Sequence, residues 1–185
     1  MKVLKFGGTS VGSVDSLLNV KKIVESCDEQ VIVAVSALGG VTNQLIAMSD
    51  MAQNHDDAWQ PVLESVKHRH LDIIDAVVIE ELKPQCRQVI EQFIDNNLRS
   101  YYGTLMVNDD LDEVVVAQLR DAIVAHGEIM SSAIVSCMIV DATPHFSPRF
   151  IKTRDIEGER RLDWEATETL VKQEFSDSTE RRIVV

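Results

Sequence analysis

Cysteine is scarce in this sequence, and its spacing excludes two kinds of structure. The 185 residues contain three cysteines, Cys27, Cys86 and Cys137, which are odd in number, far apart and without a Cys-x-x-Cys pair. A disulfide framework needs an even number of cysteines at suitable spacings, and cysteine zinc sites need close pairs. We therefore expect neither, and we interpret the three side chains as buried or unreactive thiols.

Long hydrophobic runs are also absent. The longest clean run is Val31-Ile32-Val33-Ala34-Val35, whereas a membrane-spanning helix needs roughly 18 or more apolar residues. At the N-terminus, the chain reaches Gly7-Gly8 before a secretory hydrophobic segment could develop. We expect no export signal and no membrane partner, and we place the protein in the cytoplasm.

Basic residues are outnumbered by acidic ones. There are 18 Lys and Arg against 30 Asp and Glu, which gives a net charge of −12. Binding to nucleic-acid phosphates requires a surplus of basic side chains, so we expect no nucleic-acid partner. Net charge does not describe a single pocket, and a few local cations could still hold an anionic metabolite. With 45% hydrophobic residues and only four prolines, the chain has the composition of one ordinary globular domain.

The N-terminal region has a strand, turn and helix pattern. Residues 2–6 predict a short buried strand, and a glycine-rich turn follows from Gly7. Ser13 is a suitable N-cap for a helix whose apolar residues recur at helical spacing to about Cys27.

A second unit of the same kind follows. Residues 30–36 predict a strand that is apolar throughout, as in a parallel sheet covered on both faces. After a turn at Gly39-Gly40, we expect Thr42 to cap the next helix. Two successive strand–helix units predict an α/β fold.

The middle of the chain is predicted to be helical. Helical spacing extends from about Ala58 to Ser100, and two further helices are expected at Leu111–Ile123 and Glu128–Ile139. We interpret residues of about 56–126 as a helical insertion or lid. His68 and His70 are two residues apart on a helix, so they cannot chelate a metal together, and we expect both to be solvated.

The C-terminal region returns to mixed structure. Arg149 to Thr153 predicts a strand, Glu157-Gly158-Glu159 a turn, and Asp163 the cap of another helix. Ile183-Val184-Val185 predicts the beginning of a buried strand. Because no turn or cap follows these residues, we expect that the chain is truncated.

The first glycine turn can attract phosphate. Backbone N–H groups converge where such a turn enters a helix, and Lys5 ends the strand just before it. The turn matches neither the Walker pattern, because Ser13-Val14 stands where Lys-Ser/Thr is required, nor the dinucleotide GxGxxG pattern. Two interpretations stay open on these residues alone: a phosphate-binding loop, or a tight connection with a solvated Lys5.

Three segments together resemble the aspartokinases, in this order and spacing. They are Lys5-Phe6-Gly7-Gly8-Thr9-Ser10-Val11-Gly12, Ser36-Ala37-Leu38-Gly39-Gly40-Val41-Thr42-Asn43 and Gly127-Glu128-Ile129-Met130-Ser131-Ser132. The resemblance implies the three-layer α/β/α amino-acid kinase fold, also called carbamate kinase-like. It covers nearly all of residues 1–185 but only the N-terminal portion of the family's catalytic domain. The half that binds the nucleotide base and the regulatory ACT domains are not in this sequence.

The resemblance also implies an activity. It is the transfer of the ATP γ-phosphoryl group to the β-carboxylate of L-aspartate, giving 4-phospho-L-aspartate, the first step towards lysine, threonine and methionine. The complete enzyme would use ATP with Mg²⁺. A homo-oligomer is expected, and the opening residues are similar to relatives fused to homoserine dehydrogenase. A carboxylate nucleophile is already ionised at pH 7, so no general base is needed.

Residue roles follow from the same resemblance. Lys5 would be catalytic, the phosphate-binding residues would be Lys5, Gly7, Gly8, Thr9 and Ser10, and the substrate-binding residues would be Ser36, Thr42, Asn43 and Glu128. None is expected to bind metal. Without the resemblance, Thr42 could simply cap a helix, and Glu128 could be a first-turn glutamate favoured by the helix dipole. His126 stands where many relatives carry Arg or Tyr.

Three functional hypotheses stay open. The first is an aspartate kinase whose truncated chain is inactive by itself. The second is a non-catalytic fragment that binds aspartate or dimerises. The third is a sibling kinase that acts on glutamate, acetylglutamate or a nucleotide.

Overall fold

The computed structural model describes residues 1–108, 110–156, 158–176 and 178–185. The elements of the first half are β1 (Lys2–Phe6), α1 (Val14–Glu25), β2 (Val31–Val35), α2 (Val41–Gln53), α3 (Trp59–Val77), α4 (Lys83–Gln92), a π-helical turn (Phe93–Leu98) and α5 (Arg99–Val107). Those of the second half are α6 (Glu113–Met138), β3 (Ala142–Pro144), a 3-10 helix (Ser147–Arg149), β4 (Thr153–Ile156), β5 (Glu159–Leu162), α7 (Trp164–Phe175) and β6 (Arg182–Val184).

The central feature is a parallel sheet with strand order β1-β2-β6-β3. β1 pairs with β2 over its whole length, and β6 pairs in parallel with β2 on one side and β3 on the other. The strand predicted at the end of the chain is therefore confirmed, and it lies inside the sheet. β4 and β5 form a separate antiparallel pair.

Position in the sheet explains which strands are buried. β2 lies between two neighbours, and Val31, Val33 and Val35 are buried, as its apolar sequence predicts. The expectation that residues 2–6 are buried is wrong, because β1 is an edge strand and Val3 is 67% exposed.

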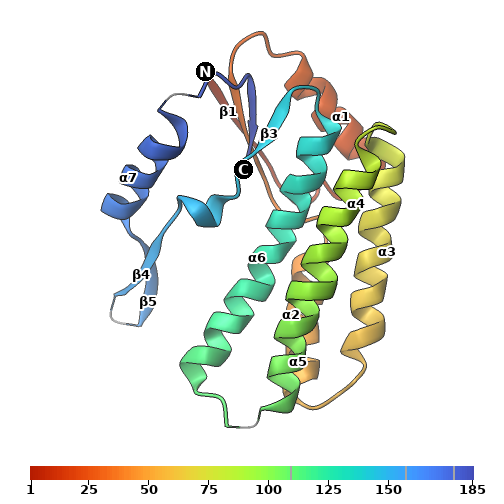
Figure 1. Ribbon diagram of the computed structural model, residues 1–185, viewed down its shortest axis with the longest axis vertical. Coiled ribbons are helices and arrows are strands. Elements are labelled where there is room, and N and C mark those ends of the chain that lie inside the picture. The colour runs from red at the N-terminus through yellow and green to blue at the C-terminus, as the bar shows by residue number, and fades with distance from the viewer. Residues whose placement is uncertain (109, 157, 177) are drawn as a thin grey trace.

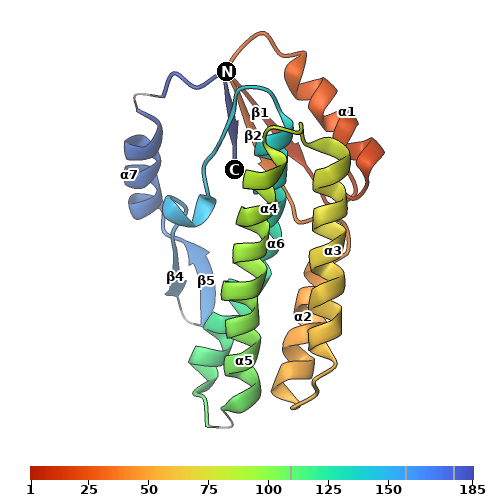
Figure 2. The ribbon, with the colours of Figure 1, turned by 45° about the vertical axis from the view of Figure 1, so that its right-hand side comes forward.

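Helices lie on both sides of the sheet, consistent with the predicted α/β fold (Figures 1 and 2). α6 packs against β2, β3 and β6, and α1 packs beside it. α7 lies on the other side of the sheet from α1 in both ribbon views (Figures 1 and 2). The predicted N-caps of α1 and α7 are confirmed, since Ser13 accepts a hydrogen bond from the Ser16 N–H and Asp163 from the Ala166 N–H.

The predicted helical middle corresponds to α3 to α5 and the first part of α6, which form a bundle together with α2 (Figure 1). Its interior contains the fully buried Tyr102, whose hydroxyl donates to the Leu45 carbonyl oxygen at 3.1 Å. The Trp59 and Tyr102 rings lie 5.3 Å apart. No helix in the described part of the chain is long and apolar enough to cross a membrane.

The two helices expected at 111–123 and 128–139 are one continuous helix, α6. Gly127 lies inside this helix and does not end it. At this point α6 approaches the loop after β2 closely, because a Cβ there would lie only 2.9 Å from the Ala37 Cβ. α6 therefore belongs both to the bundle and to the layer over the sheet.

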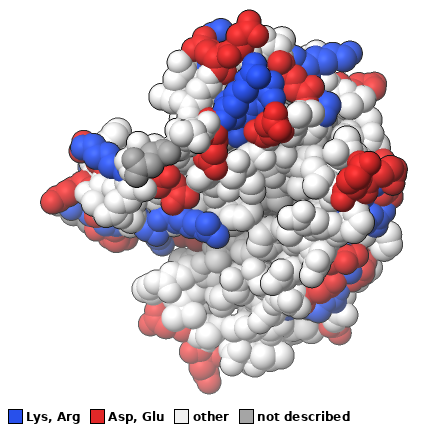
Figure 3. All heavy atoms as spheres, turned by 45° about the horizontal axis from the view of Figure 1, so that its top comes forward, with Lys and Arg blue, Asp and Glu red and all other residues white. Residues whose placement is uncertain are grey.

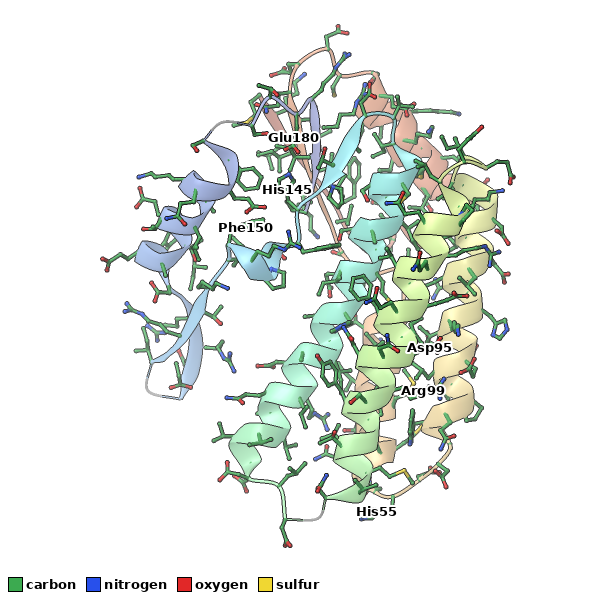
Figure 4. The ribbon with its side chains drawn as sticks, viewed as in Figure 1. His55, Asp95, Arg99, His145, Phe150 and Glu180 are labelled. Atoms are coloured by element: carbon green, nitrogen blue, oxygen red, sulfur yellow. The ribbon has the colours of Figure 1, made fainter. Side chains whose placement is uncertain are left out.

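The strand expected at 149–153 is also wrong. Residues 147–149 form a 3-10 helix, which Pro148 favours, and β4 begins only at Thr153. Phe150 is buried between them, with its ring 5.1 Å from that of Phe175 (Figure 4). The predicted turn at Glu157-Gly158-Glu159 includes Glu157, which lies outside the described residues.

Candidate active site

The two predicted ligand-binding loops lie side by side. They follow the adjacent parallel strands β1 and β2, so both leave the same edge of the sheet. The Ser36 N–H donates to the Phe6 carbonyl oxygen at 3.0 Å, which joins the loops where they begin. The opposite edge, where β1 begins, carries intermixed acidic and basic side chains, with Lys2 paired to Glu29 (Figure 3).

Glycines allow the loops to touch through their backbones. A Cβ on Gly12 would lie 2.9 Å from the Gly8 carbonyl oxygen, and a Cβ on Gly39 would lie 3.1 Å from the same atom. The first distance leaves no room for a Cβ, and the second would require the neighbouring backbone to shift, so Gly8, Gly12 and Gly39 pack backbone against backbone. These glycines therefore bring the predicted phosphate loop against the predicted substrate loop.

Lys5 is exposed at the end of β1. Its Nζ lies 3.6 Å from the position that a Cβ on Gly7 would occupy, so the ammonium group lies over the glycine turn. No carboxylate in the described residues forms an ion pair with it. The Ser10 N–H donates to the Gly7 carbonyl oxygen at 2.8 Å, so this N–H closes the turn and Ser10 has its hydroxyl left for a ligand.

Arg69 holds the first loop in place, and the sequence alone did not indicate this role. From α3, its guanidinium donates to the Gly12 carbonyl oxygen at 3.2 Å. No local pattern singles out this arginine, because only the packing of α3 beside α1 brings it to the loop.

Glu128 reaches the second loop from α6. Its Oε1 accepts a hydrogen bond from the Ala37 N–H at 3.3 Å. The interpretation as a first-turn glutamate is wrong, because Glu128 lies in the middle of α6, far from its N-terminus at Glu113. The close approach at Gly127 explains how a helical residue reaches the loop.

α2 begins differently from the prediction. Its N-cap is Gly40, with a φ of 84° in the left-handed region, and Thr42 lies within the first turn. Capping therefore does not occupy the Thr42 hydroxyl. In the parts of the chain that the structure describes, several side chains of the two loops make no hydrogen bond or ion pair: Lys5, Thr9, Ser10, Ser36, Thr42 and Asn43.

Two histidines are directed into the bundle instead of the site. His126 is buried, its Nδ1 donates to the Ala122 carbonyl oxygen at 2.7 Å, and its Nε2 accepts from the Asn97 side chain at 3.1 Å. Burial lowers the His126 pKa. His70 is fully buried, so the expectation of a solvated side chain is wrong for it and correct only for His68. Among the described residues, no group of three or more His, Cys, Asp or Glu could hold a metal ion.

The sequence model of the "Amino acid kinase family" matches residues 1–176. The chain belongs to the amino acid kinase family. One relative of this amino acid kinase chain is a bifunctional aspartokinase/homoserine dehydrogenase of Daucus carota. The two are 30% identical over 137 residues, and the match covers 73% of this chain and 14% of the relative. An aspartokinase of Candida albicans is 24% identical over 146 residues, 75% of this chain and 26% of the relative. The chain thus spans a minor part of the curated relatives' length.

Solved structures of aspartokinases share the fold. E. coli aspartokinase III in complex with lysine and aspartate superposes with a TM-score of 0.82 at 24% identity, over 100% of this chain and 40% of that one. The same enzyme in complex with aspartate and ADP gives 0.81 at 23% identity, with the same coverage. The predicted amino-acid kinase fold of this chain is therefore confirmed.

Proposed function

We propose that this chain carries the phosphoryl-transfer loop and the amino-acid-binding loop of an aspartate kinase. The complete protein would transfer the γ-phosphoryl group of ATP to the β-carboxylate of L-aspartate, giving 4-phospho-L-aspartate for lysine, threonine and methionine synthesis. One observation carries the proposal: the backbone contact of Gly8 with Gly12 and Gly39 brings the Lys5 ammonium and two sets of unpaired polar groups to one edge of the sheet.

Lys5 is the catalytic residue in this proposal. The transferring phosphoryl group spreads negative charge over its oxygens, and a fixed cation beside the turn stabilises that charge. Gly7, Gly8, Thr9 and Ser10 would surround the same oxygens. Because the acceptor carboxylate is already ionised, positioning and charge stabilisation suffice without a proton acceptor.

Glu128 is proposed to bind the ammonium group of aspartate. Its Oε1 is held by the Ala37 N–H, which orients the carboxylate and leaves the other oxygen for a cation. Ser36, Thr42 and Asn43 supply hydroxyl and amide groups from the adjacent loop and the first turn of α2.

ATP is proposed to arrive with Mg²⁺ as its counter-ion. The described residues do not fit a resident metal site, since they contain no suitable cluster of ligands. The ion therefore belongs to the substrate in this proposal, and Lys5 is the cation that this chain contributes.

The test is the Lys5→Ala variant of the complete protein. Acyl phosphate is trapped with hydroxylamine in the presence of aspartate and ATP, and we expect a loss of turnover of about 100-fold or more, the scale measured for removing one charge-stabilising donor. Lys2→Ala is the matched control, because Lys2 lies on the same strand but pairs with Glu29 at the far edge. Undiminished acyl phosphate from Lys5→Ala would overturn the proposal.

The status of the isolated chain is a second proposal. We propose that residues 1–185 alone are inactive but still bind aspartate, because this chain covers only 40% of the E. coli aspartokinase III chain with which it superposes. A coupled assay should detect no ADP release, and calorimetry should show heat with aspartate and none with ATP. Turnover comparable to the complete protein would contradict this.

Oligomer formation and a fused homoserine dehydrogenase are further proposals. Light scattering tests the first, and the length of the gene product tests the second.

Substrate choice separates the sibling kinases. We expect the complete protein to prefer aspartate over glutamate, acetylglutamate and a nucleoside monophosphate in a substrate panel. A preference for any other substrate would be compatible with the proposed role of the phosphoryl-transfer loop. It would contradict the proposal that the second loop binds aspartate.

A further inference from the structure

Two of the three cysteines lie together although they are far apart in the sequence. Cys86 lies on α4 and Cys137 lies near the end of α6, and these helices pack against each other (Figure 1). Both residues line one cavity, and the two thiols are close enough to shift each other's pKa. The third cysteine, Cys27, contacts the Ile23 carbonyl oxygen at the end of α1 and is not part of this pair.

A cavity gives the pair access to small reagents. Its volume is about 230 Å³, and its lining includes both thiols together with Phe93 and Phe146. Cys86 is 1% exposed, whereas Cys137 is only partly buried. A molecule of a few heavy atoms can therefore occupy the cavity and meet Cys137 first, since one liquid water fills only about 30 Å³.

The surroundings of the two thiols differ, which gives them different chemical roles. The interaction with the Cys86 thiol lowers the pKa of Cys137, while the same interaction and burial raise the pKa of Cys86. The thiolate is the nucleophilic form of cysteine. Cys137 is therefore suited to attack, and Cys86 to react with the product of that attack.

We propose that Cys86 and Cys137 form a reversible disulfide when the protein meets hydrogen peroxide or another small hydroperoxide. The Cys137 thiolate attacks the terminal peroxide oxygen, the O–O bond breaks, a sulfenic acid forms, and the second oxygen leaves as hydroxide or alkoxide and takes up a proton from solvent. The Cys86 sulfur then attacks the sulfenic sulfur, the S–O bond breaks, and the departing oxygen leaves as water with the Cys86 proton. With hydrogen peroxide, two thiols lose two electrons and two protons, and the peroxide is reduced to two waters.

The disulfide would act on the helix that carries Glu128. α6 extends without a break from the bundle to the cover of the sheet, and Cys137 and Glu128 are both on it. A covalent link to α4 would fix α6 to the bundle. This inference does not depend on the proposed kinase activity.

The test treats the folded protein with hydrogen peroxide and then alkylates the denatured chain. We expect near-complete loss of alkylation at Cys86 and Cys137, retention at Cys27, and one non-reduced peptide pair linking Cys86 to Cys137, all reversed by dithiothreitol. Cys27→Ser is the matched control and should give the same linked peptides.

A second variant tests the reaction of Cys137 when the disulfide cannot form. Cys86→Ser should leave Cys137 as a sulfenic acid that dimedone traps. The proposal is overturned if Cys86 and Cys137 stay fully alkylatable, if Cys27 enters the link, if the link joins two chains, or if the wild-type protein oxidises to sulfinic acid without a link.

Discussion

His70 is a base held uncharged inside α3. Its Nδ1 donates to the Val66 carbonyl oxygen at 2.7 Å, and its buried Nε2 has no hydrogen-bond partner in the structure. Burial lowers the His70 pKa from 6.5 to about 4. Between these two pH values the unfolded chain binds a proton that the folded chain does not.

This gives a prediction for acid stability. Because the unfolded state binds more protons between pH 6.5 and about 4, the free energy of unfolding decreases as the pH falls through this range, with His70 contributing at most about 1.4 kcal/mol per pH unit. His70→Phe removes this contribution and should flatten the pH dependence. Urea unfolding across the range measures it.

The control is His68→Phe, because His68 is exposed on the same helix. It should leave the slope unchanged. An equal slope in His70→Phe and wild type would show that His70 is not the group responsible.

The sequence could not decide which of these histidines is inside. Residues two apart on a helix point about 200° apart, so at most one can face the core. Lys5 and Gly8 could be singled out because they stand in a contiguous sequence motif. Arg69 was not, because its contact with Gly12 depends on how two helices pack.

At the scale of whole elements, two helical glycines provide a matched comparison. Gly127 in α6 lies against the loop after β2, where a Cβ would be 2.9 Å from the Ala37 Cβ and 3.3 Å from the Leu45 Cδ1. Gly103 in α5 has no atom within 4 Å of the equivalent position. Replacing either glycine by alanine changes the helix propensity by the same amount, so the two sites differ only in how closely the neighbouring residues pack.

We predict opposite effects of alanine at these sites. Gly103→Ala should raise the free energy of unfolding by about 0.5–1 kcal/mol, the usual gain inside a helix. Gly127→Ala gains the same propensity but pushes α6 away from the loop, and overpacking costs about 1–3 kcal/mol, so we expect net destabilisation. Thermal and urea unfolding of both variants check this. Stabilisation by Gly127→Ala would contradict the close approach.

Gly127 also lies between the two helices that the sequence predicts within the range of α6. A glycine inside a helical pattern suggests an end, and only the tertiary contact shows that Gly127 is there for space. Local signals were reliable where the chemistry is local, as with the Ser13 and Asp163 caps. They failed at Arg149–Thr153, where a 3-10 helix ends at Arg149 and Phe150 is buried before β4 begins.

At the scale of the whole molecule, His145 attaches α7 to the sheet. It follows β3, its Nδ1 lies 2.8 Å from the Glu174 Oε1 of α7, and its Nε2 lies 2.8 Å from the Glu180 Oε2 before β6 (Figure 4). Burial raises the Glu180 pKa, but hydrogen bonds from Ser178 and His145 outweigh it, and the pKa is lowered overall. One imidazole therefore joins three segments of the chain.

We predict that His145→Phe loosens α7 more than the rest of the domain. Two partly buried carboxylates lose their partner, so amide hydrogen exchange in residues 164–175 should accelerate by about tenfold, which corresponds to about 1.4 kcal/mol of local stability. The Glu180 contribution is present above its unfolded pKa and is lost as the pH falls through its lower folded value, so the difference between variant and wild type should shrink in acid.

Lys172→Ala is the control for this experiment, because Lys172 pairs with Glu168 on the exposed face of the same helix. It should leave exchange in α7 nearly unchanged. Equal exchange in His145→Phe and wild type would show that the ring contacts with Phe175 are sufficient to hold α7.

The strand order has a consequence for synthesis on the ribosome. β2 and β3 are never hydrogen-bonded to each other, because β6 fills the space between them. Translation delivers β6 on the order of ten seconds after β2. Throughout that interval β2 keeps an unpaired edge, which stays open to pairing with other strands until residues 182–184 leave the exit tunnel.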